Sequence, residues 1–313
     1  MKHFLVAVGF LTLFTLSASA QCDPEAVGAL YTKFLDNYKG TAQQLQVASV
    51  TAKEYLSRFG ECPTEPEKKV TAYIKEWQTK YEATLIESKC TNAVDKSPVQ
   101  AFQECQPYLA KDPENLRAHL LLSLAGIKIA SKAENDVKAK AVVAMRKALD
   151  LIRNGRTVDQ WIFGGSKDEA VGTLEFYSAS LTIDTEPLEA AAALLRLAHS
   201  NSSYSKDPNT YFYLARSLHD GEVKKQVDEY NKSCSGPSAP ADCDLAYKKI
   251  ESTIDRVIDA YARTVALGSG KSEHERVVAL AKPLLTELYK ERHENSEAGM
   301  DKYVADVLTK PIP

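Results

Sequence analysis

The stretch that decides the fold is KDPENLRAHLLLSLAGIKIA, residues 111–130. It begins with a Lys-Asp-Pro turn, in which Pro113 fixes a backbone angle suited to a helix start, and continues as an apolar run with helical spacing. A second stretch, KDPNTYFYLARSL at residues 206–218, opens in the same way. Inside the helix that follows, both stretches place a leucine before a small residue, Leu122-Ser123 and Leu214-Ala215. The recurrence indicates a repeated helical unit.

Helical periodicity extends over most of the chain. In residues 64–89 the large apolar residues are three or four positions apart, which marks one face of an α-helix; they are Val70, Tyr73, Ile74, Trp77, Tyr81 and Leu85. No alternating apolar and polar run bounded by an Asn-Gly or Asp-Gly turn suggests a β-hairpin. We therefore predict an all-α fold. The predicted helices lie at 24–38, 41–59, 65–88, 97–110, 113–132, 135–154, 167–182, 186–201, 208–231, 242–267, 272–292 and 296–309.

The two recurring stretches and the helices after them resemble tetratricopeptide repeats (TPRs). In this family a helix-turn-helix unit of about 34 residues places small residues where its two helices approach each other. The first-helix pattern is matched by His119, Leu122 and Ser123 and by Tyr211, Leu214, Ala215 and Leu218. The second-helix pattern is matched by Ala141, Met145 and Ala148 and by Val257, Tyr261 and Thr264. Two departures from the family are Gly126, where an aromatic residue is usual, and a large insertion between residues 208 and 267.

The resemblance implies a TPR-like solenoid of helical hairpins, with about eleven or twelve helices in all. Residues 21–110 would form an N-terminal helical-hairpin region. Residues 111–313 would form the repeats, with a disulfide-closed insertion near 232–243. Solenoids of this kind grip protein segments on a concave face lined by the first helices. The residues expected to contact a protein or peptide partner are His119, Ser123, Arg216 and His219.

The N-terminus is typical of an export signal. Residues 1–20 combine a short basic start, an apolar run from Phe4 to Leu16 and the small-residue pattern Ala18-Ser19-Ala20, so cleavage is expected before Gln21. A lipid anchor on Cys22 is the alternative, but Gln21 is not the small residue that a bacterial lipobox requires. The sequence as a whole resembles an exported bacterial protein, periplasmic or extracellular.

Six cysteines follow the predicted signal, and an even number in an exported chain favours disulfides. Cys234 and Cys243 flank a polar, Pro-containing loop with no other cysteine nearby, so we expect them to pair. Cys22–Cys62 and Cys90–Cys105 are the expected remaining pairs, although other connectivities stay open. No Cys-x-x-Cys motif occurs and no histidine lies near a cysteine, which argues against a zinc site.

The remaining patterns give no support to catalysis or to nucleic-acid binding. The formal net charge is −3 and no basic stripe occurs, whereas a nucleic-acid-binding surface needs a cationic footprint. No later segment is long and apolar enough to span a membrane. The histidines match no metal or catalytic-triad motif, and the paired acids Glu65/Glu67 and Glu273/Glu275 occupy predicted first turns of helices, where acids are favoured in any case. We therefore expect neither an enzyme nor a cofactor.

Three interpretations of function remain, of which an enzyme is the third because no residue constellation supports it. The first is an exported, non-catalytic TPR-like scaffold that binds a protein or peptide. The second is a secreted, disulfide-stapled helical carrier of a small apolar ligand, similar to the helical six-cysteine odorant-binding and salivary proteins of insects. Those proteins bring two cysteines within four residues of each other, a spacing that this chain lacks. The loop residues Trp161-Ile162-Phe163 are expected to tuck under the helices and fill a gap.

Overall fold

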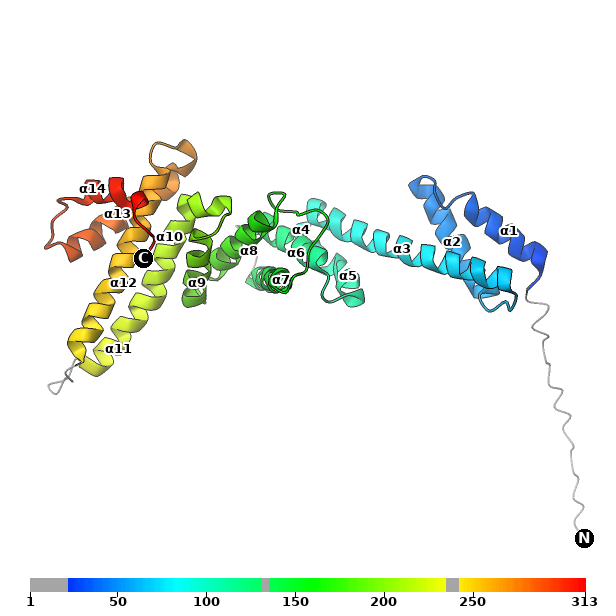
Figure 1. Ribbon diagram of the computed structural model, residues 1–313, viewed down its shortest axis with the longest axis horizontal. Coiled ribbons are helices and arrows are strands. Elements are labelled where there is room, and N and C mark those ends of the chain that lie inside the picture. Colours follow the sequence, from blue (N-terminus) through cyan, green and yellow to red (C-terminus); the bar gives the residue numbers. More distant parts are fainter. Residues whose placement is uncertain (1–21, 131–134, 235–241) are drawn as a thin grey trace, which may run out of the picture. The chain divides into compact units, whose positions relative to one another are not determined.

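The computed structural model describes residues 22–130, 135–234 and 242–313, and the predicted signal peptide lies outside them. The described residues form helices and no strand, so the predicted all-α fold is confirmed (Figure 1). The chain divides into two compact units between Ser88 and Lys89. We call them the N-terminal unit and the C-terminal unit. The boundary expected at residue 110 falls inside the C-terminal unit, in the last turn of the helix Gln106–Lys111.

The N-terminal unit consists of α1 (Pro24–Leu35), α2 (Ala42–Phe59) and the part of α3 (Glu65–Lys96) up to Ser88. Asp23 caps α1 by accepting hydrogen bonds from the backbone N–H groups of the first turn, and Thr41 forms a capping box at the start of α2. The core contains Phe34, which is fully buried and meets the Trp77 ring edge-on at 5.0 Å. Among the α3 residues whose spacing predicted a buried face, Ile74 is fully buried and Val70 and Trp77 pack against this core, whereas Tyr73 and Leu85 are exposed. The helix α3 also continues beyond the predicted end at residue 88.

The first part of the C-terminal unit is a series of short helices joined by turns. They are α4 (Pro98–Glu104), α5 (Gln106–Lys111), α6 (Leu116–Ile129), α7 (Asn135–Arg153), α8 (Lys167–Thr182) and α9 (Pro187–Ala198). Each helix from α6 to α9 packs against the helix before it or after it in the chain, and α9 continues this order onto α10 (Pro208–Ser217). This order of packing is compatible with a helical solenoid. The helix predicted over 97–110 is interrupted at Cys105, which separates α4 from α5.

The second part of the C-terminal unit is built on one long helix. It comprises α10 (Pro208–Ser217), a π-helical turn (Leu218–Val223), α11 (Lys224–Cys234), α12 (Cys243–Gly268), α13 (Glu275–Arg292) and α14 (Met300–Asp306). Short 3-10 turns occupy Ser203–Lys206, Ser272–His274 and Val307–Thr309. Both α10 and α13 pack against α12 (Figure 1). The helix expected at 208–231 therefore contains a π-helical interruption.

The packing of α6 against α7 depends on a small residue. A Cβ atom added to Gly126 would lie 2.3 Å from the Cβ of Ala141, far inside van der Waals contact. Glycine therefore sets how closely the two helices approach. Nearby, Phe163 is buried in the core that α6, α7 and α8 share, and Trp161 and Ile162 pack against it. The prediction that this loop segment tucks inward is confirmed.

The C-terminal segment is held by a buried ion pair on α12. Arg263 donates to Asp259 at 2.6 Å, and both side chains are almost fully buried. The same guanidinium donates to the backbone carbonyl oxygens of Lys310 and Pro311 at 3.0 and 2.9 Å. These bonds use donors that burial would otherwise leave unsatisfied.

Three disulfides are present, Cys22–Cys62, Cys90–Cys105 and Cys234–Cys243, which is the predicted pairing. The first belongs to the N-terminal unit and the other two to the C-terminal unit. Disulfides persist in oxidising compartments, so the three bonds are compatible with an exported protein. Among the described helices, none has the length and apolar character needed to cross a membrane.

Candidate functional site

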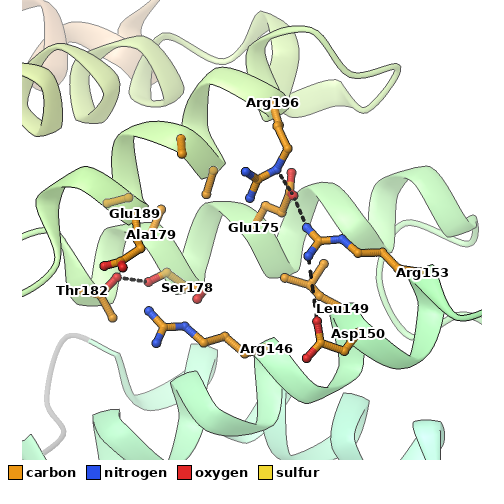
Figure 2. Close-up of a pocket in the computed structure, with 13 residues that line it drawn as sticks. Arg146, Leu149, Asp150, Arg153, Glu175, Ser178, Ala179, Thr182, Glu189 and Arg196 are labelled. Atoms are coloured by element: carbon orange, nitrogen blue, oxygen red, sulfur yellow. Dashed lines mark hydrogen bonds and ion pairs between the residues drawn. The ribbon is translucent and has the colours of Figure 1, made fainter.

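A cavity with several arginines in its lining lies between α7, α8 and α9 of the C-terminal unit (Figure 2). We call this cavity of about 300 Å³ the arginine pocket. Its lining combines three arginines, three acids and a floor of small residues. The lining residues are Arg146, Leu149, Asp150, Arg153, Glu175, Ser178, Ala179, Thr182, Glu189, Ala190, Ala192, Ala193 and Arg196.

A buried carboxylate organises one side of the arginine pocket. The Glu175 side chain is only 5% exposed, and its Oε1 atom accepts hydrogen bonds from Arg153 Nη2 at 2.8 Å and from Arg196 Nε at 3.1 Å. The three side chains come from α8, α7 and α9 respectively, as Figure 2 shows. A single carboxylate oxygen therefore joins three helices. The bonds are charge-assisted and so stronger than hydrogen bonds between neutral groups.

The arginines keep donors available to a ligand. The side chains of Arg153 and Arg196 remain 49% and 55% exposed. Each guanidinium carries five N–H donors, and Glu175 accepts a hydrogen bond from one nitrogen of each. Asp150 lies 3.9 Å from Arg153, at the limit of an ion pair. On the opposite side of the pocket, Arg146 pairs with Glu186 (Figure 2 shows Arg146 beside Ser178 and Thr182). The arginine pocket thus contains two half-exposed guanidinium groups, those of Arg153 and Arg196, which the buried Glu175 carboxylate holds in position.

A second cavity adjoins the first. The α11 pocket, of about 530 Å³, lies between the start of α9, the π-helical turn and α11, along which its lining extends from Lys224 to Lys232. Glu189 lines both the arginine pocket and the α11 pocket, so the two are neighbours. The charged residues of the α11 pocket include Lys224, Lys225 and Lys232 together with several acids. Both signs of charge are therefore present.

A third cavity is predominantly apolar. The apolar pocket, of about 650 Å³, lies between α4, α5, α6 and α7 and is lined by Val99, Phe102, Leu109, Leu122 and Val143 among others. Val99 and Val143 are more than half exposed, whereas Leu122 is buried. The apolar pocket and the arginine pocket share α7 as a wall.

Two of the residues predicted to bind a partner are buried in α6. The Ser123 side chain is fully buried and donates its hydroxyl to the backbone carbonyl of His119 at 2.7 Å. His119 donates from Nε2 to the backbone carbonyl of Pro113 at 2.9 Å, because a carbonyl only accepts. Burial lowers the pKa of His119, because it disfavours the charged form of the ring. His119 lines the apolar pocket, while Ser123 offers a partner no accessible atom.

The other two predicted residues lie together on the surface at the end of α10. Arg216 donates to Asp184 at 2.5 Å and lies 3.6 Å from Asp220, and His219 Nδ1 lies 3.1 Å from the same Asp220 carboxylate. Asp220 also lines the α11 pocket. Arg216 and His219 therefore contact a residue of the α11 pocket without lining that pocket themselves. The structure does not bring them to His119 and Ser123, which belong to α6.

The residues of the arginine pocket were missed by the sequence analysis. One signal was present: Glu175 is the only charged residue in the run VGTLEFYSA, residues 171–179. An acid on the buried side of a helix needs a partner, which predicts arginines on neighbouring helices. Neither Arg153 nor Arg196 stands out in the sequence, because arginines in the last turn of a helix are common in any case.

The described part of the chain contains no cluster of three or more His, Cys, Asp or Glu side chains that could hold a metal ion. Comparisons with protein-family models, with curated proteins and with solved structures find no match.

Proposed function

We propose that this chain is an exported, non-catalytic scaffold of TPR-like helical repeats that binds a protein or peptide partner in the periplasm or outside the cell. The observation that carries the proposal is the presence of three open pockets, each lined by neighbouring helices of the C-terminal unit. A folded enzyme active site usually encloses its substrate, whereas several small open pockets suit an elongated segment. The three disulfides support the proposed location.

The pockets revise where the partner is expected to bind. The original expectation placed it on His119, Ser123, Arg216 and His219. Burial removes Ser123 from that set, and the arginine pocket adds Arg153 and Arg196. Arg216 and His219 remain candidates for partner binding beside the α11 pocket.

Site-specific photo-crosslinking tests the proposal. A photoreactive amino acid at Val143, which is 67% exposed in the apolar pocket, is expected to capture a protein partner in the cells that produce the chain. The matched control is Leu245 on α12, which is 71% exposed and lines none of the three pockets. Capture at both positions alike, or at neither, would contradict the proposal.

The apolar pocket favours a second candidate function, the carrier of a small apolar ligand. Its volume of about 650 Å³ is sufficient for a drug-sized molecule. Native mass spectrometry of the purified chain separates the two functions, because a carrier retains an apolar mass that a peptide-binding scaffold lacks.

A further inference from the structure

The apolar pocket and the arginine pocket lie along one path on α7. Val143, Arg146, Asp150 and Arg153 are three or four residues apart and therefore share one face of the helix. At a rise of about 1.5 Å per residue, α7 extends about 15 Å from Val143 to Arg153. A ligand that reaches both pockets must therefore bridge this distance.

One end of this path favours an apolar side chain. Val143 and Val99 are exposed on either side of the apolar pocket, and the buried side chain of Leu122 contributes to its lining. Exposed apolar residues that gather around a cavity gain free energy when a partner removes them from water. A single Leu, Ile, Phe or Met side chain is small enough to enter a cavity of this volume.

The other end favours a negative charge. Arg153 and Arg196 share one oxygen of one carboxylate, so two positive charges face a single buried negative charge. Asp150 is 65% exposed and lies at 3.9 Å, where water screens its attraction to Arg153. The remaining N–H donors of the two guanidinium groups are positioned to bind an incoming carboxylate. The α11 pocket is lined by lysines and acids and by no arginine, so it offers no comparable pair of guanidinium groups.

We propose that the partner presents an extended peptide segment with a large apolar side chain in the apolar pocket and an Asp or Glu carboxylate against Arg153 and Arg196. This inference rests on the proposed scaffold function and names the chemistry of its ligand. An extended chain advances about 3.3 Å per residue, so the two side chains lie about four or five residues apart. A fatty acid also has an apolar part and a carboxylate. However, Val99 and Val143 leave the apolar pocket open to water, while small apolar ligands bury most of their surface.

Selection from a random peptide library displayed on phage, with the full mature chain as bait, tests this proposal. The expected result is enrichment of peptides in which an acid follows or precedes a large apolar residue by about four or five positions. In a synthetic representative, replacing the acid with its amide is expected to raise the Kd about tenfold, because a charge-assisted hydrogen bond is lost. Fluorescence anisotropy of the labelled peptide measures this change.

Matched protein variants locate the two contacts. Val143→Asp is expected to weaken binding of the selected peptide, whereas Leu245→Asp, at an equally exposed position on α12, leaves it unchanged. The triple variant Arg153→Gln, Arg196→Gln and Glu175→Gln removes the charges without stranding the buried carboxylate. It is expected to bind the acidic peptide and its amide equally. Arg58→Gln, which removes an exposed arginine of the N-terminal unit, is the control.

Three outcomes would overturn the inference. Enriched peptides without the apolar–acid spacing, or with equal affinity for acid and amide, would refute the ligand chemistry and leave the scaffold function standing. Failure to enrich any peptide would count against both. Retention of palmitate, added as a probe, together with the absence of peptide binding would replace both with the carrier function.

Discussion

Glu175 shows at the scale of a single residue how burial and charge decide stability. Its carboxylate is almost fully buried, while the two arginines that bind it are half exposed. Removing the carboxylate and removing the two arginines are therefore expected to change stability by different amounts. Arginine rehydrates when its partner is lost, but a buried carboxylate without donors has lost both water and its ion pairs.

This asymmetry gives a testable prediction. Glu175→Gln is expected to lower the free energy of unfolding by about 1 kcal/mol, because the freed guanidinium groups return to water. The double variant Arg153→Gln and Arg196→Gln is expected to cost about 3 kcal/mol, because it leaves the carboxylate buried and unpaired. Urea unfolding of the three proteins measures the difference. Equal losses for the two changes would contradict this account.

The sequence predicts residue roles poorly here for a physical reason. Spacing places His119 and Ser123 on a first helix, but it does not reveal that their polar atoms bond to backbone carbonyls of the same segment. Such local bonds allow polar side chains to be buried. The Glu175 contacts are made across three helices and depend on tertiary packing, which spacing within one helix does not encode.

At the scale of the helix, glycine has opposite effects at two positions. Gly126 of α6 faces Ala141 of α7 so closely that a methyl group would overlap it. Gly28 of α1 has no neighbouring atom within 4 Å of an added Cβ. Both residues are helical, so the same substitution tests packing at one position and helix propensity at the other.

Gly126→Ala is expected to destabilise the protein by about 1–3 kcal/mol, since α6 and α7 must separate to admit the methyl group. Gly28→Ala is expected to stabilise it by roughly 0.5–1 kcal/mol, because alanine has the higher helix propensity and meets no obstacle. Thermal unfolding followed by circular dichroism compares each variant with the wild type. A stabilising effect at position 126 would show that the α6–α7 contact is looser than described.

Elements were more predictable than residue roles. The predicted helix starts at residues 24 and 208, each at a proline, are confirmed for α1 and α10, because such signals are local. The predicted start at Pro113 is wrong, because α6 begins at Leu116 and is capped by the Asn115 side chain. The break at Cys105 and the π-helical turn at Leu218–Val223 were not predicted, since the amino-acid pattern there remains helical. The departure of Gly126 from the TPR pattern is explained by the close approach of α7.

At the scale of the whole molecule, disulfides and tryptophans are divided between the two units. The Cys22–Cys62 bond belongs to the N-terminal unit, as does Trp77, whereas Trp161 belongs to the C-terminal unit. Since the chain contains two tryptophans, the Trp161→Phe variant reports on the N-terminal unit alone.

In the Trp161→Phe variant, replacing Cys22 and Cys62 with serine is expected to lower the free energy of unfolding by about 4 kcal/mol, as measured through Trp77. The estimate follows from the entropy that closing a loop of this length removes from the unfolded chain. Urea titration followed by Trp77 fluorescence measures the loss. Replacing Cys234 and Cys243 instead serves as the control and is expected to leave the Trp77 transition unchanged. Equal shifts for both cysteine pairs would show that the units do not unfold independently.

The hydrogen bonds of Arg263 determine which mutations the C-terminal segment tolerates. Arg263 binds Lys310 and Pro311 through main-chain oxygens, which every amino acid possesses. Selection acting through this contact therefore preserves the path and length of the backbone and leaves the codons at these two positions largely free to drift. A deletion one residue upstream would be far more damaging, because it shifts the carbonyl groups out of register with a guanidinium that has no access to water in their place.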